Sequence, residues 1–144
     1  MERRKVKVAI AGGFDPIHAG HIDHIRKASL LGDYLVVIVA RDIQLIKKKG
    51  YCFLPLAERL EIVRAIKGVN EVVVNIDKDL GCAATLELIK PDIFAKGGDR
   101  IVGNIPYAEV DICNKINCRL VYGVGDSLNS SQAIVEKAIH NMAS

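Results

Sequence analysis

Short apolar segments alternate with helix-like segments about five times along the 144 residues of this chain. The stretch Tyr34–Ala40, YLVVIVA, is apolar and rich in β-branched residues, which is typical of a strand buried on both faces of a parallel sheet. Strands are expected at Lys5–Ala11, Tyr34–Ala40, Glu71–Ile76, Asp92–Ala95 and Arg119–Tyr122. The alternation predicts one doubly wound α/β domain, residues 1–144, built around a five-stranded parallel sheet.

The helical segments show apolar residues three or four positions apart. After Pro55, for example, Leu56, Leu60 and Val63 form one apolar stripe, and Gly68 ends the segment. Helices are expected at Ala19–Leu31, Pro55–Gly68, Ala83–Ile89, Pro106–Asn117 and from Asn129 or Ser130, either of which could cap the helix, to about Met142. The stretch Arg41–Phe53, which holds three consecutive lysines, is expected to be irregular.

Composition and charge exclude several classes of protein. Hydrophobic residues make up 50% and charged residues 26% of the chain, which is typical of globular proteins and excludes a disordered tail or a collagen-like repeat. The 20 basic and 17 acidic residues leave a charge of +3, too small to indicate a nucleic acid or a membrane as the partner. No signal-peptide pattern is found at the start and the four cysteines form no C-x-x-C pair, so we expect free thiols and a cytoplasmic location.

The segment Gly12–His21, GGFDPIHAGH, directly follows the first expected strand. In doubly wound sheets, ligands bind at the carboxyl ends of the strands, near the point where the strand order reverses. The glycines let the backbone approach a ligand closely, and the N–H groups at the start of the next helix suit a phosphate. His18 and His21 are three positions apart, so both rings can lie on one side of the first turn, where they bind phosphate or simply cap the helix.

Three segments together resemble the signature of the cytidylyltransferase-like, or HxGH, nucleotidyltransferases. The first is G-x-F-D followed by H-x-G-H at Gly12–His21, with Leu31–Val37, LGDYLVV, similar to bacterial glycerol-3-phosphate cytidylyltransferases. The second, Lys96–Asp99, KGGD, is similar to the adenylyltransferase domain of ADP-heptose synthases. The third, Asn129–Ile134, NSSQAI, resembles the family motif I-S-[ST]-[ST]-x-I. The resemblance implies a Rossmann-like fold and a homodimer.

The resemblance also implies roles for individual residues. The catalytic residues would be His18 and His21, which meet the triphosphate, and a lysine after the second strand. Lys47 is the candidate for this lysine, with Lys48 and Lys49 left open. The nucleotide would be bound by Gly12, Gly13, Phe14, Asp15, Gly20, Lys96, Gly98, Asp99, Asn129, Ser130 and Ser131. Asp42 and Arg59 would contact the substrate.

Each of these roles has a simpler structural alternative. The lysine run could be a solvated face, Asp42 a plain loop acid, and the two serines helix caps. His24 continues the histidine spacing without an acidic fourth ligand, so we expect it on the surface or in the core, and we expect no metal held by the protein.

The implied reaction is transfer of a nucleoside monophosphate from CTP to a polyol phosphate or sugar phosphate, with release of pyrophosphate. A phosphate monoester is mostly dianionic at pH 7 and needs no general base, so catalysis reduces to positioning and positive charge. Mg²⁺ would be held mainly by the triphosphate.

Two other functions stay open. The glycerol-phosphate enzymes carry Thr where this chain has Gly13, and Arg where it has Gly125, so an ATP-dependent adenylyltransferase of the heptose-phosphate type is the first alternative. The second is a non-catalytic nucleotide-binding regulatory domain. A dinucleotide-dependent oxidoreductase would need G-x-G-x-x-G after the first strand, where this chain has G-G-F-D-P-I.

Overall fold

The computed structural model describes residues 4–97, 106–126 and 130–143. Within them, five parallel strands form one sheet in the order β3-β2-β1-β4-β5. The strands are β1 (Lys7–Gly12), β2 (Tyr34–Val39), β3 (Glu71–Val74), β4 (Ile93–Ala95) and β5 (Arg119–Val121). The predicted Rossmann-like α/β fold with a five-stranded parallel sheet is confirmed, and every predicted strand is present within about two residues of its expected ends.

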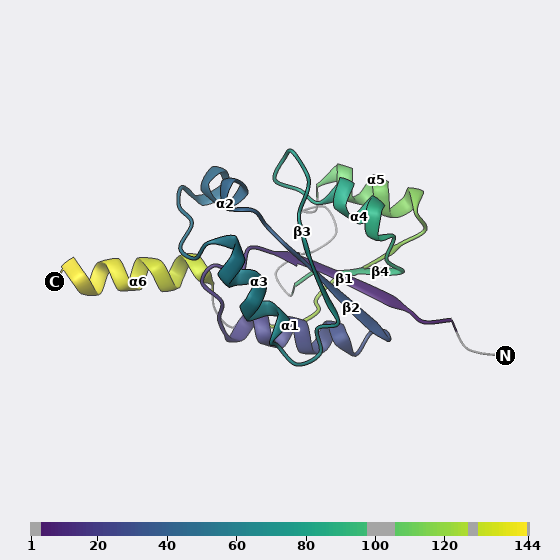
Figure 1. Ribbon diagram of the computed structural model, residues 1–144, viewed down its shortest axis with the longest axis horizontal. Helices are drawn as coiled ribbons and strands as arrows, with labels where there is room; N and C mark the ends of the chain where they lie inside the picture. Colours follow the sequence, from purple (N-terminus) through teal and green to yellow (C-terminus); the bar gives the residue numbers. More distant parts are fainter. Residues whose placement is uncertain (1–3, 98–105, 127–129, 144) are drawn as a thin grey trace.

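Helices cover both faces of the sheet. The helices of the described residues are α1 (Ala19–Ser29), α2 (Asp42–Lys49), α3 (Leu56–Arg64), α4 (Ala83–Ile89), α5 (Tyr107–Lys115) and α6 (Ser131–Ala143). Figure 1 shows α1 and α3 on one face and α4 and α5 on the other. Side chains of α1 and α3 pack in one buried cluster and those of α4 and α5 in a second, with the sheet between them.

The central strands are buried on both faces, as their composition predicts. Leu35, Val37 and Val39 of β2 join the cluster under α1 and α3, whereas Ile38 joins the cluster under α4 and α5. A strand with two dry faces needs apolar side chains at consecutive positions. This is why the sequence shows a continuous apolar run there.

The prediction of an irregular segment over Arg41–Phe53 is wrong in its first half, which forms α2. The Gln44 side chain accepts a hydrogen bond from the Arg41 backbone N–H at 2.8 Å, and Gly50 ends the helix in the left-handed conformation at φ 88°. The lysines occupy its last turn, where positive charge is favoured. Exposed Ile43 and Ile46 hid the helical pattern, because they break the polar face.

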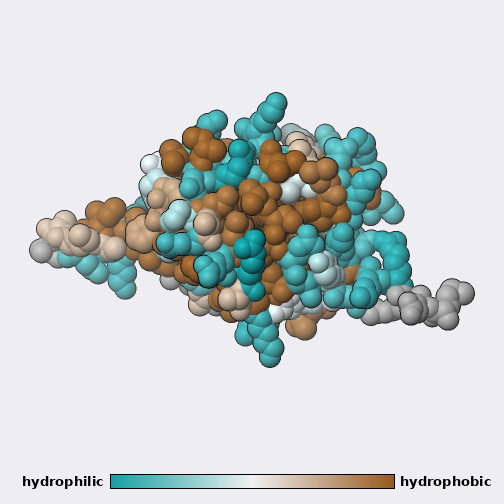
Figure 2. Space-filling view, in the orientation of Figure 1, coloured by the Kyte–Doolittle hydropathy of each residue, from teal (hydrophilic) through white to brown (hydrophobic). Residues whose placement is uncertain are grey.

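α6 has no buried residue and extends away from the sheet in Figure 1. Figure 2 shows hydrophobic side chains on one side of it and hydrophilic ones on the other, in line with the exposed Ile139 and Met142. Ser130 caps the helix by accepting a hydrogen bond from the Ala133 N–H at 3.0 Å, as predicted. Among the described residues, no helix has the length and apolar character needed to cross a bilayer.

The strand order reverses at β1, which lies between β2 and β4. Ligands of doubly wound sheets bind outside the carboxyl ends of the strands at such a switch point. The carboxyl end of β1 leads into Gly12 and Gly13, so the fold brings the glycine–histidine segment to this crevice.

Candidate active site

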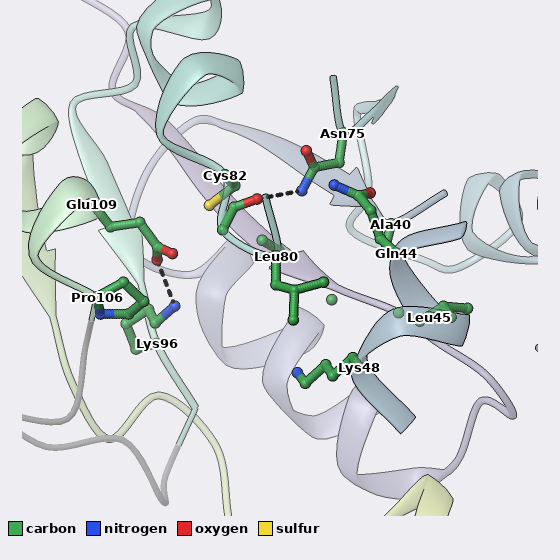
Figure 3. A pocket seen from close by; sticks show the side chains of 14 residues that line it. Ala40, Gln44, Leu45, Lys48, Asn75, Leu80, Cys82, Lys96, Pro106 and Glu109 are labelled. Atoms are coloured by element: carbon green, nitrogen blue, oxygen red, sulfur yellow. Dashed lines mark hydrogen bonds and ion pairs between the residues drawn. The ribbon is translucent and has the colours of Figure 1, made fainter. Parts of the chain in front are cut away.

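Two adjoining cavities open at this end of the sheet. The larger measures about 420 Å³ and is lined by residues from the turn after β1, α1, α2, the end of β4 and the start of α6. The smaller measures about 140 Å³ and lies toward α2, α4 and α5 (Figure 3). Both are lined by Ala11, Gly12, Gly13, Leu45, Lys48 and Lys96. The cavities therefore meet over the carboxyl end of β1, with one lysine on either side.

The larger cavity brings together predicted residues that are far apart in the sequence. They are Gly12, Gly13, Phe14, Asp15, His21, Lys96 and Ser131. Gly98, Asp99 and Asn129 lie outside the described residues. The predicted roles of all these residues in binding stay predictions.

Side chains pack closely against both glycines at the end of β1. A Cβ added to Gly12 would lie 3.1 Å from a ring carbon of Phe14, and one added to Gly13 would lie 2.6 Å from Cδ2 of Leu45. Phe14 itself is buried and adopts a positive φ of 54°, with its ring centroid 4.9 Å from that of His21. Phe14 thus packs under the turn and supports the histidine, although it also borders the cavity.

His18 and His21 form a reciprocal cap at the start of α1. Nδ1 of His18 accepts a hydrogen bond from the Gly20 N–H at 3.0 Å, and Nδ1 of His21 accepts one from the His18 N–H at 3.1 Å. The two rings stack with centroids 3.9 Å apart. Because each Nδ1 acts as an acceptor, the proton of each neutral ring must be on Nε2. The cap thereby fixes the direction of both Nε2–H donors. His21 lines the larger cavity and His18 lines neither, so capping and phosphate binding are compatible roles for His21, whereas phosphate binding by His18 stays a prediction.

Burial keeps these rings neutral at physiological pH. It lowers the pKa of His18, and it lowers the pKa of His21 to about 3, with the neighbouring His18 as the second cause. A neutral imidazole still donates one hydrogen bond from Nε2. Fixed positive charge at the cavities must therefore come from lysine.

His24 was expected on the surface or in the core, but it lines the larger cavity. Its Nδ1 donates a short hydrogen bond to the carbonyl of Val124, so its tautomer is opposite to that of the other two histidines. Gly125 packs against it at a positive φ of 104°, where an added Cβ would lie 2.9 Å from Cα of His24. In this arrangement a larger residue than glycine does not fit at position 125.

The end of α2 carries two lysines to the site. Lys48 lines both cavities and Lys49 lines the larger one, whereas Lys47 is exposed and lines neither. Lys49 also lies 3.6 Å from the carboxylate of Asp15. The sequence could not choose among three adjacent lysines, because their directions depend on a helix that it did not predict. A role for Lys47 stays a prediction.

Asp15 anchors the segment between α2 and α3. Its two carboxylate oxygens accept hydrogen bonds from the backbone N–H groups of Phe53 and Leu54, each at 2.6 Å. The side chain is fully buried. Asp15 therefore lines the larger cavity while its carboxylate holds this segment in place.

Arg59 and Asp42, predicted to contact substrate, line neither cavity. The Arg59 side chain is 0% exposed, and its guanidinium donates to the carbonyls of Gly13 at 3.0 Å and Ala40 at 2.6 Å. It also donates to the carbonyl of Leu54 at 2.8 Å and to Oδ1 of Asp42 at 2.6 Å. Arg59 thus holds together the chain just beyond the ends of β1 and β2. Its predicted direct contact would require this network to break.

Lys96, at the end of β4, reaches the boundary of the two cavities and pairs with Glu109 of α5 at 3.1 Å.

Ser131 lines the larger cavity while its hydroxyl donates a hydrogen bond to the Pro16 carbonyl at 2.7 Å. This bond holds the start of α6 against the turn before α1. Glu109 and Gln132 are further lining residues that the sequence did not single out. No local pattern could have found them, since only the packing brings them to the crevice.

The model of the cytidylyltransferase-like family matches residues 9–123, which is more than half of the chain. The chain belongs to the cytidylyltransferase-like family. The family relationship predicted from the H-x-G-H segment is therefore confirmed.

Curated proteins that are similar to this chain carry the names of two different enzymes. A FAD synthase of Pyrococcus horikoshii is 39% identical over 98 residues, covering 67% of this chain and 66% of the relative, just under two thirds of its length. An ethanolamine-phosphate cytidylyltransferase of Arabidopsis thaliana is 44% identical over 72 residues, covering 50% of this chain and 17% of the relative. Among solved structures, a lipopolysaccharide core biosynthesis protein of Thermoplasma volcanium has a TM-score of 0.73 at 28% identity, covering 85% of this chain and 99% of that one.

Proposed function

We propose that this protein transfers a nucleoside monophosphate from a nucleoside triphosphate to the phosphate group of a small molecule. An oxygen of the acceptor phosphate attacks the α-phosphorus of the donor, the bond to the β-phosphate oxygen breaks, and pyrophosphate leaves. The observation that carries this proposal is the pair of cavities that share Lys48, Lys96 and the glycine turn. Two anions can meet at such a boundary only where positive charge and N–H donors offset their repulsion.

The larger cavity suits the triphosphate. His21 offers an Nε2–H donor there, Lys49 adds charge, and Ser131 opens α6 with its first N–H groups. The smaller cavity is left for the acceptor, whose phosphate would lie between Lys48 and Lys96. The acceptor phosphate is already largely dianionic, so the mechanism assigns no general base.

Mg²⁺ would enter with the triphosphate and would supply positive charge for the leaving pyrophosphate. The carboxylates at the two cavities are already engaged, Asp15 by two backbone N–H groups and Glu109 by Lys96. Among the described residues there is no group of three or more His, Cys, Asp or Glu side chains that could hold a metal ion. The donor set therefore fits an ion carried by the nucleotide.

For the donor nucleotide we favour ATP, because the FAD synthase relative matches a larger share of this chain than the ethanolamine-phosphate cytidylyltransferase does. FAD contains an adenylyl group joined to flavin mononucleotide, which makes flavin mononucleotide one candidate acceptor. CTP with a polyol or sugar phosphate, the prediction from sequence, is the second candidate, supported by the cytidylyltransferase relative. A homodimer stays a prediction from the family resemblance, and a cytoplasmic location stays a prediction from the cysteine pattern and the start of the sequence.

A grid of ATP, CTP, GTP and UTP against flavin mononucleotide, glycerol 3-phosphate, heptose 1-phosphate and phosphoethanolamine, each with Mg²⁺, tests the proposal. Pyrophosphate release that requires both a donor and an acceptor is the expected result. Tight nucleotide binding by calorimetry without turnover on any acceptor would instead favour the regulatory domain.

A further inference from the structure

Glu109 is a buried carboxylate at the wall of the smaller cavity. It lies in the first turn of α5, is only 3% exposed, and its Oε1 is 3.1 Å from the Lys96 ammonium (Figure 3). Within the described part of the chain, Lys96 is its one charged partner. Moving a carboxylate out of water costs free energy unless an opposite charge or hydrogen bonds pair with it. The burial of this ion pair therefore indicates a role that an exposed ion pair would not need.

Lys96 is the group that gains from the pairing. Its side chain is 14% exposed and lines both cavities, and its ammonium lies 4.6 Å from the ring centroid of Phe94. A lysine side chain is long and flexible, so its ammonium needs a partner to stay in one place. The Glu109 carboxylate, 3.1 Å away, is such a partner.

We propose that Glu109 is a positioning residue that holds the Lys96 ammonium in place at the boundary of the two cavities. This inference rests on the proposed function, in which the acceptor phosphate and the triphosphate meet at that boundary. Lys48 approaches the same boundary from α2, on the opposite side of the smaller cavity. Glu109 thus acts on the reaction through Lys96, without touching the reacting atoms.

A second ion pair of the same geometry shows what a plain surface bridge looks like. Glu87 of α4 pairs with Lys115 of α5, also at 3.1 Å, but the two side chains are 48% and 69% exposed and line neither cavity. Exposed ion pairs of this kind contribute little to the stability of a protein. Glu87→Gln is therefore a matched control for Glu109→Gln.

Other ionisable groups surround the Lys96–Glu109 pair. Asp77, before α4, is held by the backbone N–H groups of Ala84 and Thr85. Burial first and Glu109 second raise the pKa of the Cys82 thiol, while a hydrogen bond with Cys118 lowers the pKa of the Cys113 thiol. Lys48 faces the cavity from α2.

The test replaces Glu109 with Gln, which keeps the shape and removes the charge. NMR of ¹³C-lysine-labelled protein, with Lys96→Met to assign the signal, should show the Lys96 ε-CH₂ group ordered in the wild type and E87Q and mobile in E109Q. In the transfer assay at pH 7, E109Q should raise the acceptor KM at least tenfold, whereas E87Q should not change it.

The remaining outcomes separate this inference from the proposed function. A Lys96 ε-CH₂ group that stays as ordered in E109Q as in the wild type overturns the inference. So does a loss of activity on adding E109Q to the Lys96→Met variant that equals the loss in the wild type, because Glu109 would then act independently of Lys96. A wild type that transfers no nucleotide defeats the proposed function instead. The NMR measurement, and calorimetry of pyrophosphate binding by the wild type and E109Q, then still decide whether Glu109 holds an anion-binding Lys96 in place.

Discussion

Arg59 gives a sharp test of whether a residue at this site binds substrate or builds the site. Its buried guanidinium makes four hydrogen bonds, three to the carbonyls of Gly13, Ala40 and Leu54 and one to Asp42. The Arg59→Lys variant keeps the positive charge. Its compact ammonium cannot reach all four acceptors, which are arranged around the planar guanidinium of arginine. The variant therefore separates charge from geometry.

The expected cost of Arg59→Lys follows from the bonds that are lost. If lysine keeps two of the four hydrogen bonds, two bonds from a charged donor are lost, each worth about 1.5–3 kcal/mol. The free energy of unfolding should therefore fall by about 3 kcal/mol or more. At about 2–4 °C per kcal/mol for a domain somewhat larger than this one, the melting temperature should fall by roughly 10 °C.

Thermal melting of R59K beside Arg64→Lys, an exposed arginine of the same helix, measures this difference. R64K should melt within about 2 °C of the wild type, since exposed substitutions change stability little. If R59K melts like R64K while the acceptor KM rises, Arg59 contacts substrate directly and the structural argument is refuted.

Three further predictions concern the same site. His21→Gln retains the cap, because glutamine can also accept a hydrogen bond from the His18 N–H, but it loses the imidazole Nε2–H donor. The melting temperature should therefore change little, while kcat in the transfer assay should fall by roughly 10²-fold. Because the folded pKa of His21 lies near 3 and the unfolded value near 6.5, the folded state binds fewer protons, and stability must fall as pH drops through this window, by up to about 1.4 kcal/mol per pH unit. Urea unfolding at pH 7, 6 and 5 should show a shallower decline for H21Q, and equal slopes would contradict the buried neutral ring. Asp15→Asn leaves one of the Phe53 and Leu54 N–H groups without an acceptor and should cost about 1–3 kcal/mol in urea unfolding, whereas an unchanged midpoint with lost nucleotide binding would make Asp15 a ligand.

The family and the fold were predictable because their signals are local. The apolar run at Tyr34–Val39 and the alternation of strands and helices specify a parallel sheet, and Gly12–His21 places a phosphate-type turn after its first strand. These patterns depend on neighbours in the chain, which the sequence displays directly. α2 was missed because two exposed isoleucines obscure its periodicity.

The roles of individual polar residues needed the tertiary structure. Arg59 and Asp15 resemble ligand-binding groups in the sequence, but the packing turns both inward onto backbone groups. Lys48 and Glu109 reach the cavities from α2 and α5 only because those helices pack beside the end of β1. By itself, the sequence determined the sheet, the glycine–histidine turn and the family, since these follow from periodicity and short motifs. Which charges face the cavities was decided by the tertiary structure, because a side chain's direction and burial depend on partners distant in the chain.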